Sequence, residues 1–220
     1  MPEDPISPSD HEAAPDLVRV TRKRPKPGER RVQILQALAA MLEQPGAERI
    51  TTAALAARLS VSEAALYRHF ASKAQMFEGL IEFIEQTVFS LVNQIAEREQ
   101  AATADGNSAA RHCARVVLMV LQFAEKNPGM TRVMVGDALV FENERLQQRM
   151  NQFFDKIEAT LRQGLRGTGE VNGSATPSVD AQVLASVLTA FVVGRLHRYA
   201  RSGFKRVPTE HLDASLALML

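Results

Sequence analysis

Residues 49–73 place the tightest constraint on the fold, because they read as two short helices separated by about three residues. Thr51 is a favourable N-cap for the first helix and Ser62 for the second. Apolar side chains at helical spacing would hold the pair at a steep angle, and the small Ala56 would let the helices cross closely. The pattern predicts a helix-turn-helix, whose second helix enters the major groove of DNA. An ordinary pair of short core helices would have the same spacing.

Particular side chains of this unit suit contact with DNA. Ala64 and Ala65 are small enough to let the second helix sit deep in the groove and meet thymine methyl groups. Hydroxyl, imidazole and ammonium groups at the edges of the two helices suit phosphates. The candidate DNA-binding residues are therefore Thr51, Thr52, Ser62, Ala64, Ala65, Tyr67, Arg68, His69 and Lys73.

Charge is unevenly distributed, although the net charge of the whole chain is only +1. Residues 1–16 hold five acidic residues and no Lys or Arg, whereas residues 17–73 hold eleven bases and four acids. Residues 74–220 are nearly balanced, with fifteen bases and sixteen acids. The basic cluster that includes Arg22, Lys23 and Arg24 can neutralise phosphates, and we count these three among the candidate DNA-binding residues. A solvated basic tail beside an acidic one is the alternative.

Helical periodicity and the absence of alternating strand patterns predict an all-α fold. The expected helices cover residues 29–42, 52–59, 63–70, 73–100, 108–126, 131–141, 144–166, 179–202 and 209–220, with a long loop over 167–178. Six of the ten prolines fall in residues 1–27, so this acidic and basic extension is expected to be disordered. We therefore expect two domains after this extension. A three-helix DNA-binding domain would cover residues 28–73, and a helical dimerisation and partner-binding domain would cover residues 74–220.

The helix-turn-helix string resembles the DNA-binding domain of the tetracycline-repressor (TetR) family. The resemblance rests on Thr51-Thr52, Leu55-Ala56, Val61-Ser62, the run 66–70 and Ser72-Lys73. It implies an all-α homodimer that binds palindromic double-stranded DNA, with a four-helix bundle between the subunits. Ser60 stands where the family usually has glycine, which implies strain at positive φ in the turn.

Residues 181–199 are apolar on nearly all sides, so one helix face would pack on the subunit and the other on a second copy. A single buried helix in a monomer is the alternative. The residues expected at the dimer interface are Leu188, Val192, Leu196 and Tyr199.

A narrower resemblance, to the nucleoid occlusion factors within the TetR family, extends over residues 28–166 and 180–216. It is carried by residues 62–86, 123–163 and 201–216, most of which lie outside the DNA-binding unit. It implies a cytoplasmic, nucleoid-associated regulator of cell division that binds chromosomal palindromes as pairs of dimers. While bound there, such a protein inhibits ring assembly by the division GTPase FtsZ over the nucleoid.

The same resemblance implies a partner-binding surface with Phe83, Lys126 and Asn127, and Lys126 would suit an acidic tail of FtsZ. Leu91 and Gln122 depart from the family at this surface, and Phe83 fits a core position equally well. Two other functions stay open: a transcriptional repressor released by a small ligand, and an architectural DNA binder without a protein partner.

Several classes of protein are not expected. A single cysteine excludes a disulfide framework and a Cys-rich zinc site. We find no phosphate-binding loop, zinc motif or nucleophile elbow, so we expect no enzyme, cofactor or metal. Residues 181–194 form the longest uncharged, mostly apolar stretch, which is too short to span a bilayer, and no signal peptide is evident, so we expect no membrane partner.

Overall fold

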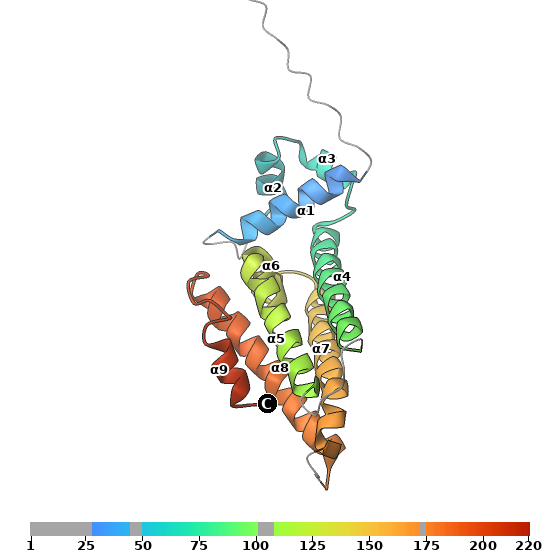
Figure 1. Ribbon diagram of the computed structural model, residues 1–220. Helices are drawn as coiled ribbons and strands as arrows, with labels where there is room; N and C mark the ends of the chain where they lie inside the picture. Colours follow the sequence, from blue (N-terminus) through green and yellow to red (C-terminus); the bar gives the residue numbers. More distant parts are fainter. Residues whose placement is uncertain (1–27, 45–49, 101–107, 172–174) are drawn as a thin grey trace, which may run out of the picture.

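The computed structural model describes residues 28–44, 50–100, 108–171 and 175–220 (Figure 1). Within these residues the chain forms helices and no strand. The elements in chain order are α1 (Glu29–Leu42), α2 (Thr52–Arg58), α3 (Glu63–Tyr67), α4 (Lys73–Gln100), α5 (Ser108–Lys126), α6 (Pro128–Met134), the 3-10 helix η2 (Asp137–Leu139), α7 (Glu144–Val171), α8 (Pro177–Arg201) and α9 (Leu212–Ala217).

Helices α1–α3 form a small unit at one end of the molecule, and α4–α9 form an elongated body (Figure 1). The join between them is the start of α4, where Ser72 and Gln75 make a reciprocal cap. The Gln75 amide nitrogen donates to Ser72 Oγ at 3.2 Å, and the Ala71 amide donates to Gln75 Oε1 at 2.8 Å. The two backbone donors at this helix end are thus satisfied, so α4 begins sharply at Lys73.

A second join packs α6 against α1. A Cβ atom built on Gly129 would lie 2.0 Å from the carbonyl oxygen of Ala39 in α1. Only glycine permits this approach of two helix backbones. One hydrophobic core therefore continues from Ile34 and Leu38 in α1 to Leu212 and Leu216 at α9.

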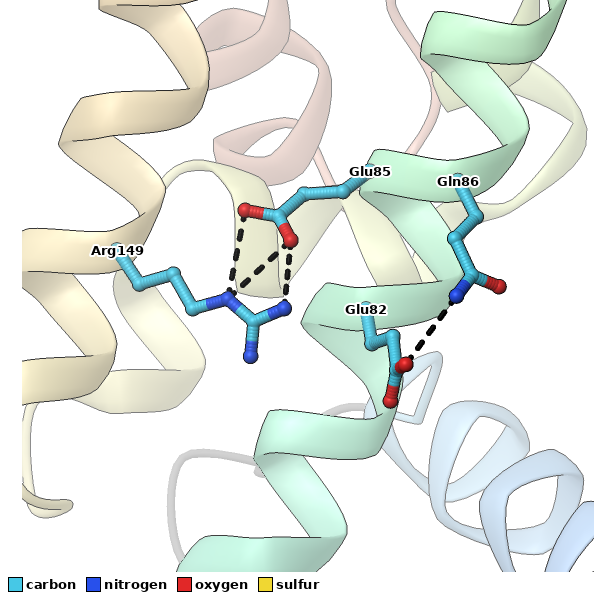
Figure 2. Close-up of polar contacts among 4 residues, drawn as sticks. All are labelled: Glu82, Glu85, Gln86 and Arg149. Atoms are coloured by element: carbon cyan, nitrogen blue, oxygen red, sulfur yellow. Dashed lines mark hydrogen bonds and ion pairs between the residues drawn. The ribbon is translucent and has the colours of Figure 1, made fainter.

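Polar contacts add to the packing of the body. Arg149 on α7 donates to both carboxylate oxygens of Glu85 on α4, from Nε at 3.3 and 3.2 Å and from Nη2 at 2.5 Å (Figure 2). The hydrogen bond to Glu85 raises the pKa of Arg149, so the guanidinium stays protonated. The nearby Gln86 Nε2 donates to Glu82 Oε1 within α4 at 3.1 Å.

Several expected helix boundaries were wrong. Helix α3 ends at Tyr67 rather than at residue 70. The expected helix over 131–141 is instead α6, which starts at Pro128 because proline suits the first helical turn. It is followed by Gly136 at φ 83° and then by η2. Helix α7 continues to Val171, and α8 starts at Pro177, so most of the loop expected over 167–178 is helical; α9 is shorter than the expected 209–220.

The rotational orientation of α8 corrects the expected dimer interface. Leu188, Val192, Leu196 and Tyr199 are at most 4% exposed and pack inside the subunit. The outward face instead carries Val179, Val183 and Val187, which are 58%, 58% and 46% exposed. Packing against α7 turns the stripe of Leu188, Val192, Leu196 and Tyr199 inward, so these four residues cannot form an outer surface.

Helix α8 also corrects the expectation about membrane spans. It is the one helix of the described residues whose length and apolar composition suit a span, and a third of its most apolar window is buried in this subunit. Core helices of soluble proteins share these properties, so one such helix is weak evidence for a membrane.

We predict that Gly129→Ala destabilises the protein, because the new methyl group would meet the Ala39 carbonyl and push α6 away from α1. The expected loss is about 2 kcal/mol in the free energy of unfolding, measured by urea denaturation. An unchanged or increased stability, as expected for alanine at an unobstructed helix position, would refute the close packing of α6 on α1.

Candidate nucleic-acid interface

Helix α3 presents a small polar surface with alanines at its N-terminal end. Ser62, Ala64, Tyr67 and Arg68 are exposed, whereas Ala65 and His69 are half-buried. The hydroxyls of Thr51 and Ser62 serve as N-caps, accepting from the amides of Ala54 at 3.1 Å and Ala65 at 3.3 Å. Their first role is therefore to fix the starts of α2 and α3.

The turn between α2 and α3 has the conformation that the sequence predicts. Ser60 lies at φ 54°, in the left-handed region that glycine usually occupies. The backbone amides of Ser60 and Val61 donate to the carbonyls of Ala57 and Ala56, both at 3.0 Å. These bonds hold serine in the strained conformation and set the angle between the two helices.

Arg31 clamps the C-terminal end of α3 from α1, a role that sequence reasoning missed. Its Nη1 donates to the backbone oxygen of His69, and its guanidinium carbon lies 4.1 Å from the centroid of the Phe70 ring. The contacts join residues 38 positions apart. Arg31 looks, in sequence, like one more base of the basic cluster, so no local signal could have shown this contact.

Two predicted phosphate contacts already have partners within the protein. The Thr52 hydroxyl donates to Glu63 Oε2 at 2.5 Å and thereby links α2 to the start of α3. Lys73 forms an ion pair with Glu142, in the corner that precedes α7. A phosphate could contact Thr52 or Lys73 only in competition with these carboxylates. The basic residues Arg22, Lys23 and Arg24 lie outside the described residues.

The residues expected to bind a protein partner differ in exposure. Phe83 on α4 is 44% exposed, so its interpretation as a core residue is wrong. Lys126 at the end of α5 is exposed. Asn127 is half-buried, and its Nδ2 donates to the Phe123 carbonyl at 2.7 Å, which ends α5. Leu91 is half-buried and Gln122 exposed. Phe83 lies in the first half of α4, and Lys126 is the last residue of α5.

Other chemistry is scarce in the part of the chain that the structure describes. Cys113 is buried, and its Sγ lies 3.6 Å from the Leu161 carbonyl, as fits a structural thiol. Among the described residues no group of three or more His, Cys, Asp or Glu side chains could hold a metal ion.

Family models match both parts of the chain. A model described as "Bacterial regulatory proteins, tetR family" matches residues 34–80, and a model described as "Tetracyclin repressor-like, C-terminal domain", of the SlmA-like group, matches residues 109–220. Solved structures agree in fold. A TetR-like regulator from Rhodococcus sp. has a TM-score of 0.66 at 17% identity and covers 89% of this chain and 94% of its own. The regulator FadR from Bacillus subtilis, in complex with stearoyl-CoA, has a TM-score of 0.64 at 15% identity. The match covers 86% of this chain and 96% of the FadR chain.

The fold and the two family models thus define a TetR-like regulator, a class of DNA-binding proteins. Curated relatives are much more similar in sequence. The nucleoid occlusion factor SlmA of Photobacterium profundum is 52% identical over 185 residues, which cover 84% of this chain and 90% of that relative. SlmA of Vibrio cholerae is 51% identical over 191 residues, covering 86% and 93%. The chain belongs to the SlmA family of nucleoid occlusion factors.

We predict that Arg31→Ala weakens binding to specific DNA about tenfold, because loss of a charge-assisted hydrogen bond releases the end of α3. Fluorescence anisotropy with a labelled palindrome would measure the dissociation constant. Arg31→Lys keeps the charge but not the planar stacking and should not restore affinity.

Arg30→Ala is the matched control for this prediction. Arg30 is the neighbouring base on α1, and its Nη1 donates only to Gln33 of the same helix. Equal losses in Arg30→Ala and Arg31→Ala, with full rescue by Arg31→Lys, would indicate that Arg31 acts through its charge alone.

Proposed function

We propose that this protein is a nucleoid occlusion factor, which binds palindromic chromosomal sites and there inhibits assembly of the FtsZ ring over the nucleoid. The observation that carries the proposal is about 50% identity to proteins of that name over most of the chain, including the body as well as the DNA-binding unit. The protein would act in the cytoplasm, associated with the nucleoid, as a negative regulator of cell division.

DNA would be read by the exposed surface of α3. Ala64, at its N-terminal end, is exposed and can approach base edges closely, and the next residue, Ala65, is half-buried. Tyr67 and Arg68 are exposed on the following turn and suit phosphate or base contacts, and Thr51 starts the supporting helix. Arg31 would keep this surface in register with the groove by holding the other end of α3.

Two copies would pair through the outward face of α8. Val179, Val183 and Val187 recur every four residues and form an exposed apolar stripe that water solvates poorly. A two-fold dimer presents the same stripe from both copies and places two recognition helices on the two halves of a palindrome.

We predict that Val183→Asp converts the dimer to monomers, because the symmetric contact would bury two unpaired carboxylates and weaken association at least about a hundredfold. Analytical ultracentrifugation measures the mass. Val140→Asp is the control, since Val140 is 62% exposed in the corner before α7 and away from the stripe. A Val183→Asp protein that sediments like the wild type would rule out this interface.

FtsZ would bind on the surface that includes Phe83 and Lys126. An exposed aromatic ring can anchor an apolar side chain of a peptide, and the Lys126 ammonium complements an acidic tail. Asn127 would contribute through the shape of the turn between α5 and α6, because its side-chain amide is already bonded to Phe123.

We predict that FtsZ co-sediments with the wild-type protein plus its cognate DNA, and that Phe83→Ala and Lys126→Glu each reduce the bound fraction at least about fivefold, as expected for interface anchors. Phe141→Ala is the matched control, because Phe141 is similarly exposed, at 61%, in the corner before α7. DNA affinity is measured for each variant, so that a loss of FtsZ binding is separated from a loss of DNA binding.

A ligand-released repressor is the second candidate, favoured by a cavity of about 590 Å³ between α6, α7 and α8 that is lined by Met134, Met150, Phe154 and His197 among others. Genome-wide mapping of binding sites distinguishes the two functions. Many dispersed sites, sparse near the replication terminus, support nucleoid occlusion. One or two sites beside the protein's own gene, together with no co-sedimentation of FtsZ, would overturn the first proposal in favour of the second.

A further inference from the structure

A basic pocket lies where α8 ends and the chain turns back towards α9. The pocket has a volume of about 590 Å³ and is lined by Arg195, Arg198, Lys205, Arg206, Val207, Pro208, Glu210 and His211. Figure 1 shows this turn at the edge of the body away from α4, so the pocket is separate from both the α3 surface and Phe83.

The positive charge of the pocket is not neutralised within the described residues. Four of the lining residues are Arg or Lys, and Glu210 is the only carboxylate. Arg198, Lys205 and Arg206 are exposed and have neither an ion pair nor a side-chain hydrogen bond in the described structure. Residues 74–220 as a whole are nearly balanced in charge, so this concentration of cations is local.

Favourable interaction with the helix dipole does not account for all these cations. Arg198 and Arg201 lie in the last turn of α8, where positive charge stabilises the helix end. Lys205 and Arg206 lie beyond the end of the helix and are brought back beside it by the turn. Their mutual repulsion costs free energy, which a bound anion would offset.

The walls of the pocket are held in place before any ligand binds. Arg195 donates from Nη1 to the Glu210 carbonyl at 2.8 Å and from Nη2 to Ser215 Oγ at 3.0 Å. Ser202 Oγ accepts from the amides of Lys205 at 3.1 Å and Arg206 at 2.9 Å. The segment is therefore fixed to α8 at one end and to α9 at the other.

Contacts with α5 fix the same segment from outside. Thr209 Oγ1 donates to Glu125 Oε2 at 2.7 Å, and the Tyr199 hydroxyl donates to the Glu125 carbonyl at 3.1 Å. Burial raises the pKa of Tyr199, so its hydroxyl keeps the proton that it donates. A preformed concave site loses little conformational entropy on binding.

We propose that this pocket binds a small anion with two or more linked phosphate groups, such as a nucleoside polyphosphate. A guanidinium group offers a planar pair of donors that matches phosphate oxygens, and the pocket brings Arg198 and Arg206 together with the ammonium of Lys205. A ligand with a single carboxylate group would leave most of the positive charge of the pocket unpaired. The volume falls within the range of small-molecule sites.

The test is isothermal titration calorimetry of the full chain with inorganic pyrophosphate and with ATP, in magnesium-free buffer. The double variant Arg198→Gln/Arg206→Gln should bind both probes at least about tenfold more weakly, because it loses charge-assisted hydrogen bonds. Lys205→Gln, which changes an ammonium group without an ion pair or hydrogen bond among the described residues, should show a smaller loss in the same direction. Inorganic phosphate should bind more weakly than pyrophosphate to the wild type.

The control is Arg98→Gln/Arg166→Gln, which removes the same charge from exposed sites near the ends of α4 and α7. Its affinities should stay within about twofold of the wild type, since screening weakens distant charges. The titrations are repeated with the protein saturated by specific DNA, and binding should persist. The proposal is overturned if the wild type binds neither probe, if both double variants lose affinity equally, if phosphate binds as tightly as pyrophosphate, or if DNA abolishes binding.

Discussion

The approach of α6 to α1 at Gly129 makes the DNA-binding unit and the body one mechanical piece. The glycine leaves no space between itself and the Ala39 carbonyl, so the two helices cannot slide without breaking the core that runs through both. The capped start of α4 joins the two parts a second time, and the ion pair between Lys73 and Glu142 fixes this start of α4 to the corner before α7. Arg31 connects α1 to the end of α3, and the close approach at Gly129 connects α1 to α6. The DNA-binding unit and the body are therefore joined by packing rather than by a linker.

Local sequence signals predicted the elements that depend on local chemistry. The bounds of α1, α4 and α5 agree with the periodic pattern, and the caps at Thr51, Ser62 and Ser72 are formed as their residue types indicate. The starts of α6 and α8 were predicted too late, at residues 131 and 179, because Pro128 and Pro177 begin these helices instead of lying in the loops before them. The contact of Arg31 with His69 and the pairing of Lys73 with Glu142 were beyond prediction, because each joins residues far apart in the chain.

Helix α8 shows why the dimer face could not be chosen from sequence. Its residues are apolar nearly all round, so periodicity gives no unique inward direction. In the structure the inward stripe holds leucines at 188 and 196, whereas the outward stripe holds valines at 179, 183 and 187. The inward stripe also holds Ala181, Ala185 and Val192, so side-chain size does not distinguish the two faces either. Packing against α7 and α5 fixes the rotation of the helix, and this packing joins residues that are distant in the chain.

The near-zero net charge of the chain conceals two basic features that differ in shape. The α3 surface stands at the end of the molecule, where a stiff duplex can lie against it (Figure 1). The pocket beside α8 is a hollow into which the exposed cations Arg198, Lys205 and Arg206 are brought together, so it suits a small anion. Both would attract phosphate by the same electrostatics, and salt would weaken both. Charge alone cannot distinguish a DNA duplex from a small anion, so the shape of each site must do so. A small phosphorylated anion could then be bound in the pocket while the recognition helix remains in the groove of DNA.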